Sequence, residues 1–78
     1  MAIQRHTIHA VVYPGDGQGY VAECLDLAVV TQGKTLDETA QNLREAIQLH
    51  LNGEDLNELG FAPNPTLLLT FEMESVHA

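Results

Sequence analysis

Polar and apolar residues alternate along the first part of the chain, with the two-residue period of a β-strand that has one buried face. Across residues 3–13, the two faces of this predicted strand are His6, Ile8, Ala10 and Val12 on one side, and Thr7, His9, Val11 and Tyr13 on the other. The run PGDGQG (residues 14–19) then predicts the turn of a hairpin, because proline and glycine favour tight turns. Residues 20–24 are predicted to form the second strand, and residues 27–32 the third.

After Thr35, the spacing of apolar residues changes to that of an α-helix. Glu38 follows Thr35 by three residues, the spacing of a capping box at a helix N-terminus. Apolar residues then recur at helical spacing along one stripe, made of Leu36, Ala40, Leu43, Ala46, Ile47 and Leu51. Gly53 is a typical helix stop, so the helix is predicted over residues 36–52.

The segment after the helix is predicted to lead back to the sheet. The run EDLNELG (residues 54–60) is expected to add one helical turn, with Leu56 and Leu59 packing against the rest of the fold. Pro63 and Pro65 then favour an extended backbone. Residues 67–73 alternate again and predict the last strand.

This order predicts one α+β domain over residues 1–78, with the topology β-β-β-α-β. The first three strands form an antiparallel meander, and the helix returns the chain so that the fourth strand pairs parallel to an earlier one. A domain of this size buries only about 60% of its unfolded surface, which favours self-association to a dimer or higher oligomer. The sheet face without a helix, which carries His9, Val11 and Tyr13, is expected to meet a second copy or a partner.

Charge is the strongest signal in the composition. The chain has 11 acidic and three basic residues, for a formal net charge of −8. Such a chain has no basic patch, so we expect no binding of nucleic acid by this chain alone. The acidic balance leaves two alternatives, a basic protein partner or solubility alone. No apolar run approaches the length of a membrane span, and the N-terminus does not resemble a signal peptide, so a cytoplasmic protein is expected.

The run AVVTQGKT (residues 28–35) matches the loose form of a phosphate-binding loop. Its valines favour a strand over a loop that wraps a phosphate, and the acidic chain opposes phosphate binding. We therefore predict that the run is a strand, with Gly33 and Lys34 as the turn and Thr35 as the helix cap.

The histidines and the single cysteine predict neither a metal site nor a nucleophile. His6 and His9 lie three residues apart on a strand and so point to opposite faces, while His50 and His77 are far apart in sequence. Cys24 lies in a strand beside acidic residues and is predicted to be a buried apolar side chain. Catalytic residues, metal ligands and cofactors are all predicted to be absent.

A metal-dependent nuclease is a weaker alternative. Nucleases of the ribonuclease H type hold two magnesium ions with several carboxylates, one of them in the middle of the first strand. Residues 3–13 contain no carboxylate, so Glu45, Glu72 and Glu74 lack that companion.

Three stretches together resemble the HicB family, the antitoxins of bacterial and archaeal HicAB toxin–antitoxin pairs. They are GYVAECLDL (19–27), VVTQGKTLDE (29–38) and the helix end EAIQLHL (45–51). The resemblance covers about residues 8–51 and a compatible last strand. It implies a partial ribonuclease H-like fold, an oligomer, and a protein that neutralises HicA, a small basic toxin that cleaves mRNA.

The resemblance and the acidic charge of the chain together predict that acidic side chains face the toxin. The predicted partner-binding residues are Glu23, Asp26, Glu54, Asp55 and Glu58. Many HicB proteins carry a C-terminal DNA-binding domain, and because few residues follow Met73 we expect no such domain here. Many also have a proline after the cysteine and a Pro-Gly pair after the Asp-Leu, where this chain has Leu25 and Ala28-Val29. The alternative function is a solitary HicB-like regulatory or ligand-binding module without a toxin.

Overall fold

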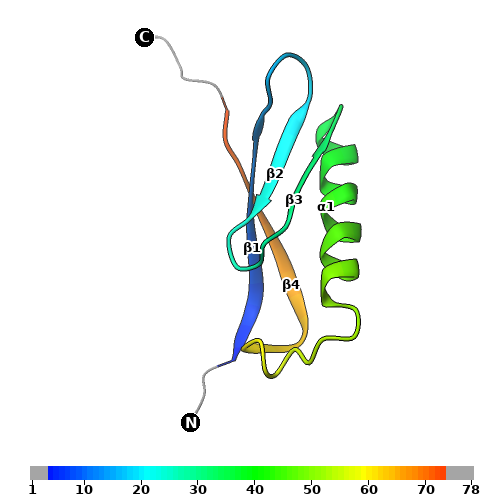
Figure 1. Ribbon diagram of the computed structural model, residues 1–78. Helices are drawn as coiled ribbons and strands as arrows, with labels where there is room; N and C mark the ends of the chain where they lie inside the picture. The colour runs from blue at the N-terminus through cyan, green and yellow to red at the C-terminus, as the bar shows by residue number, and fades with distance from the viewer. Residues whose placement is uncertain (1–3, 74–78) are drawn as a thin grey trace.

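Four strands form one mixed sheet, and one helix lies against one of its faces (Figure 1). The computed structural model describes residues 4–73. The strands β1 (Arg5–Pro14), β2 (Tyr20–Cys24), β3 (Val30–Gly33) and β4 (Phe61–Phe71) lie in the order β3-β2-β1-β4. Helix α1 (Leu36–Leu51) connects β3 to β4. Within residues 4–73, no helix has the length and apolar character that crossing a bilayer requires.

The predicted α+β class and the order β-β-β-α-β are confirmed. The first three strands form the antiparallel meander, with Val12 opposite Ala22 and Ala22 opposite Thr31. β4 runs parallel to β1, with Ile8 beside Leu67. A parallel pair needs a long crossover, and α1 with the segment after it supplies that crossover.

The core lies between α1 and the sheet face that it covers. Ile8, Ala10 and Val12 of β1 are buried, as the two-residue alternation predicted, and Leu43 and Ile47 of α1 pack onto the same cluster. His6, which the alternation placed on the same face, is exposed. The side chains on the other sheet face are at most partly buried, because the helix covers only one side.

The junction between β3 and α1 confirms the predicted helix cap. The hydroxyl of Thr35 accepts a hydrogen bond of 3.0 Å from the backbone N–H of Glu38. Thr39 is completely buried, and its hydroxyl donates to the carbonyl of Thr35 at 2.7 Å. Gly33 lies directly against this turn, and a Cβ at that position would be only 2.7 Å from the backbone nitrogen of Thr39. The Gly-Lys-Thr run therefore joins a strand to a capped helix, and its glycine allows the close approach.

The third strand begins later than predicted. Residues 27–32 were the expected strand, but β3 spans Val30–Gly33. Residues 25–29 instead form a tight loop, in which Val29 donates to the carbonyl of Leu27 and accepts from the N–H of Cys24. Val29 is buried in this loop, so its apolar character marks the core and not the strand.

The last strand begins earlier than predicted. β4 starts at Phe61, not at residue 67. Phe61 already pairs with Arg5 of β1, and its side chain is almost fully buried. Asn64 has a positive φ of 54°, and the register with β1 shifts around it, so the Pro63–Pro65 stretch is an irregular part of the strand. The strand also ends at Phe71, before the predicted limit at Met73.

Two leucines contradict the predicted packing around the helix. The segment after α1 does form one hydrogen-bonded turn, with Leu59 N–H donating to the carbonyl of Asp55 at 3.2 Å. Leu56 packs against the core as predicted, but Leu59 is 41% exposed and Leu36 is 40% exposed. The periodicity identified the apolar stripe, but Leu36 at its start is exposed, whereas Leu51 at its other end packs against the core.

Replacing Gly33 with alanine is expected to lower the free energy of unfolding by about 1–3 kcal/mol, since the new methyl group must displace the backbone of Thr39. Gly15→Ala is the matched control, because its nearest neighbour is a movable side-chain atom of Val21 at 3.3 Å. Urea unfolding followed by circular dichroism measures both changes. An equal loss in the two variants would show that the close approach of β3 and α1 is not what requires glycine.

Candidate functional site

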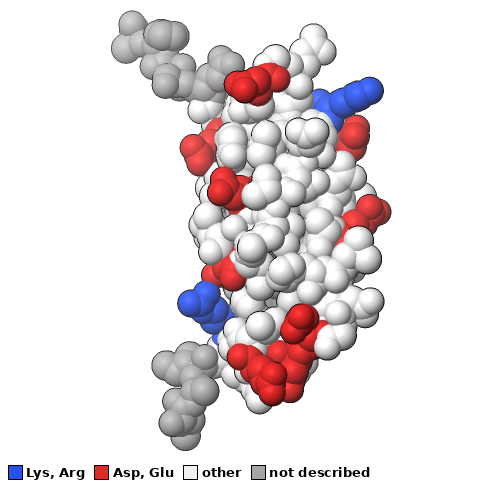
Figure 2. Space-filling model, viewed as in Figure 1, with Lys and Arg blue, Asp and Glu red and all other residues white. Residues whose placement is uncertain are grey.

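Three of the five predicted partner-binding acids lie together at one end of the molecule. Glu54, Asp55 and Glu58 are all exposed in the segment between α1 and β4. Figure 2 shows acidic side chains gathered at the lower end of the molecule, where Figure 1 places this segment. We call these three residues the acidic end.

The local backbone directs the acidic end outward. Gly53 has a φ of 81°, a left-handed conformation that glycine adopts readily and that ends α1. The N–H of Glu54 then donates to the carbonyl of Leu51 at 3.0 Å. The carboxylate of Asp55 accepts from the N–H of Asn57 at 2.9 Å, which holds the following turn. Leu56 points to the core from this turn, so the acids beside it face solvent.

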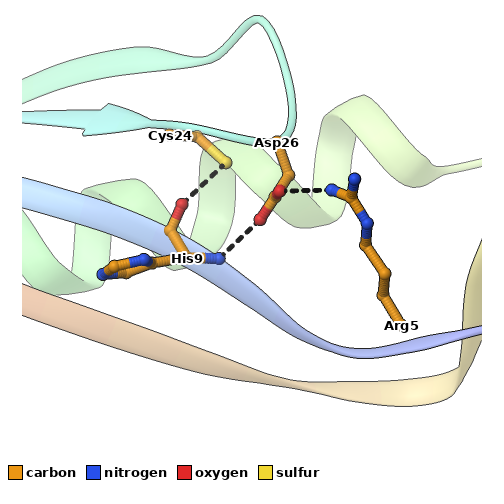
Figure 3. Close-up of polar contacts among 4 residues, drawn as sticks. All are labelled: Arg5, His9, Cys24 and Asp26. Atoms are coloured by element: carbon orange, nitrogen blue, oxygen red, sulfur yellow. Dashed lines mark hydrogen bonds and ion pairs between the residues drawn. The ribbon is translucent and has the colours of Figure 1, made fainter.

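Asp26 has a different environment, which Figure 3 shows in detail. Its carboxylate accepts one hydrogen bond from the guanidinium of Arg5 at 2.6 Å and another from the backbone N–H of His9 at 2.8 Å. The side chain of Asp26 is only 16% exposed, whereas that of Arg5 is 64% exposed. Both carboxylate oxygens therefore already have partners within the chain.

Asp26 completes the hydrogen bonding of β1 where β2 ends. β2 stops at Cys24, opposite Ala10, so His9 has no strand residue beside it on that edge. The carbonyl of His9 accepts from the N–H of Leu25 at 2.8 Å and from the thiol of Cys24 at 3.7 Å. The carboxylate of Asp26 accepts the hydrogen bond that the backbone N–H of His9 donates. The sequence predicted a partner-facing acid here, and the structure gives the residue an internal role.

Glu23 lies on the sheet face away from α1, which we call the open face. It is exposed, and its carboxylate accepts a hydrogen bond of 3.3 Å from the hydroxyl of Tyr13. Partial burial raises the pKa of Tyr13, and the negative charges of Glu23 and Glu72 raise it further. His9 and Thr70 form another side-chain pair on this face, at 2.6 Å.

The open face also carries apolar side chains that nothing in the described chain covers. Val30 is 66% exposed and Leu68 is 51% exposed. The mixed character expected of this face is therefore present, with polar pairs beside exposed apolar groups. Glu23 is separate from the acidic end, so the five predicted acids do not form one site.

The described residues contain no group of three or more His, Cys, Asp or Glu side chains placed to hold a metal ion. Cys24 is buried, as predicted. His9 points to the open face and His6 is exposed. Glu74 and His77 lie outside the described residues.

The sequence interpretation missed one feature of the surface, the outer side of β4. Leu69 and Phe71 lie on the same face as the core residues of β1, yet they are 36% and 40% exposed. A signal was present in the sequence, because no charged residue occurs between Glu58 and Glu72. That run was predicted as a strand, but its place at the edge of the sheet depends on the pairing with β1.

No protein-family model matches the chain, and no curated protein or solved structure is significantly similar to it.

Asp26→Ala is expected to cost about 1–3 kcal/mol of unfolding free energy, because the N–H of His9 loses its acceptor. Arg5→Ala is the control, since it removes the exposed half of the ion pair and is expected to cost less than about 1 kcal/mol. Chemical denaturation of both variants tests this ranking. If Arg5→Ala is as costly as Asp26→Ala, the ion pair and not the backbone hydrogen bond is the stabilising contact.

Proposed function

We propose that this protein is a HicB-like antitoxin that binds and neutralises a small basic HicA-type toxin by protein–protein contact. The three HicB-like stretches support this function, and the observed order β-β-β-α-β is the order that a partial ribonuclease H-like fold of this family requires. In this proposal the protein is not an enzyme, and it acts in the cytoplasm by covering its partner.

The observation that carries the proposal is the acidic end. Within residues 4–73 the salt bridge is the one between Arg5 and Asp26, so the carboxylates of Glu54, Asp55 and Glu58 have no cationic partner in that range. Three unpaired charges within five residues produce a concentrated negative potential on one end of the molecule.

A basic surface that binds RNA phosphates would be attracted to this end. Opposite potentials speed the encounter of two proteins and align them before contact. The proposed partner recognises a polyanion, so the acidic end would compete with RNA for the same basic side chains. The net charge of −8 on the whole chain also attracts a basic partner at long range.

The alternative is a solitary HicB-like module, regulatory or ligand-binding, that has the same fold and no toxin. The groove between α1 and β4 is the observation that favours it. This groove has a volume of about 810 Å³ and includes Ile47, Leu51 and Leu67 in its apolar lining, with Gln41 and Arg44 among the polar residues.

Co-expression with the small basic reading frame adjacent to the gene tests the antitoxin function. We expect the basic protein to arrest growth when expressed alone, and this chain to form a complex with it and restore growth. Absence of both the complex and the rescue would reject the antitoxin function and leave the solitary module.

Neutralising the acidic end should slow association with the toxin by about tenfold at low ionic strength, with a smaller effect at high salt. The variant combines Glu54→Gln, Asp55→Asn and Glu58→Gln. The matched control combines Asp16→Asn, Glu38→Gln and Glu45→Gln, which changes the net charge equally at exposed positions elsewhere. Stopped-flow binding measures both. Equal slowing in the two variants would show that only net charge matters and that the acidic end is not the docking site.

A further inference from the structure

β4 has a free edge. It pairs with β1 on one side and is the last strand of the sheet on the other. The N–H of Glu72 donates to the carbonyl of Val12 at 2.8 Å, which fixes the direction of alternate backbone groups along β4. The N–H and C=O groups of Leu67, Leu69 and Phe71 therefore point away from β1. They form a row of backbone donors and acceptors along the outer side of the sheet.

Only the first half of this edge is protected. Sheet edges are usually blocked by charges, prolines, bulges or short strands. Pro63, Pro65 and the irregularity at Asn64 protect the beginning of β4. From Leu67 to Phe71 the strand has no proline, no charge and no bulge. β3, at the opposite edge, is short by comparison and ends beside Lys34.

Apolar side chains flank the free edge on both faces of the sheet. Leu69 and Phe71 are partly exposed on the helix side, and Leu68 is half-exposed on the open face. On the helix side, this apolar surface continues into the groove between β4 and α1, which Ala40 and Ile47 also line. An edge with unpaired backbone groups and apolar side chains on both faces is a template for another strand.

We propose that the free edge pairs with β4 of a second copy of this chain, antiparallel and centred on Leu69. In this register Leu69 faces Leu69 of the second copy, and Leu67 faces Phe71. All of these residues direct both backbone groups outward, so each pair exchanges both of its N–H···O=C bonds. The result is a continuous sheet of two copies with both helices on the same face.

Two features of the sequence select this register. Centring the pair on Leu68 would place Phe71 opposite Pro65, which has no N–H to donate. Centring it on Thr70 would place the charged Glu72 opposite Leu68. Centring it on Leu69 instead places Glu72 opposite Thr66 and uses only complete donor–acceptor pairs between Leu67 and Phe71.

The uncharged run Leu67–Phe71, whose outward residues match one another in an antiparallel pair, favours a second copy as the occupant. Two chains of net charge −8 repel one another over most of their surfaces, and β4 is a long uncharged run on which they can approach. The acidic ends lie near the start of β4 in each copy, so antiparallel pairing places them at opposite ends of the assembly. A stable dimer buries at least about 1,200 Å², more than a strand pair alone supplies. In the proposed dimer, the partly exposed side chains of Leu69 and Phe71 from both copies add to the contact on the helix side.

Light scattering after size exclusion tests the dimer. At about 100 µM, well above a micromolar Kd, the unmodified protein is expected to have the mass of two chains. Leu69→Lys places two like charges against each other at the centre of the interface and is expected to give monomers. Leu49→Lys is the matched control, because Leu49 is 75% exposed on α1, and this variant should remain dimeric. A monomeric unmodified protein, or a dimeric Leu69→Lys variant, would overturn the proposal.

A cysteine crosslink tests the register, and it decides the question if Leu69→Lys fails to fold. Both variants carry Cys24→Ala. Leu69→Cys should form a disulfide between copies on mild oxidation, since facing residues of this kind have Cα atoms about 5.5 Å apart. Leu67→Cys should not, because the two positions would be roughly 13 Å apart along the strands. A monomer band for Leu69→Cys, or equal crosslinking of both variants, would refute this pairing.

Discussion

The parallel pairing of β4 with β1 determines how the rest of the chain is arranged. β1 is an inner strand, and its alternating residues Ile8, Ala10 and Val12 supply the floor of the core. For β4 to run beside it in the same direction, the chain must return along the length of the sheet, and α1 makes that return. The acidic end lies where this crossover turns back to the sheet, and β4 becomes an outer edge. Both surfaces to which we assign interactions follow from the one pairing.

Much of this fold could be predicted from periodicity and capping alone. The Thr35 cap, the stripe through Leu43 and Ile47, and the alternation of β1 all depend on local sequence, and the structure confirms them. The errors occur where tertiary contacts decide the outcome. Val29 is buried in a loop, and Phe61, the first residue of β4, is buried in the core. A pattern of apolar residues shows which side chains are buried but does not distinguish a strand from a buried loop.

The candidate site was predictable only in part, for a similar reason. Sequence identified all five acids but could not distinguish those with internal partners from those without. Asp26 accepts a backbone hydrogen bond because β2 ends one residue short of His9, and this depends on the strand register. The acidic end, by contrast, combines residues close in sequence, so its exposure follows from local turn chemistry. The uncharged run in β4 could be recognised as a sheet edge only once the strand order was known.

We propose different partners for the two surfaces: a basic toxin for the acidic end and a second copy for the β4 edge. Hydrogen–deuterium exchange of the chain, with and without the purified basic partner, tests the first assignment most directly. We expect slower exchange of the backbone amides at residues 53–60 in the complex, and little change along Leu67–Phe71, which the second copy covers in the proposed dimer. Unchanged exchange at residues 53–60, together with new protection on the open face, would contradict this assignment.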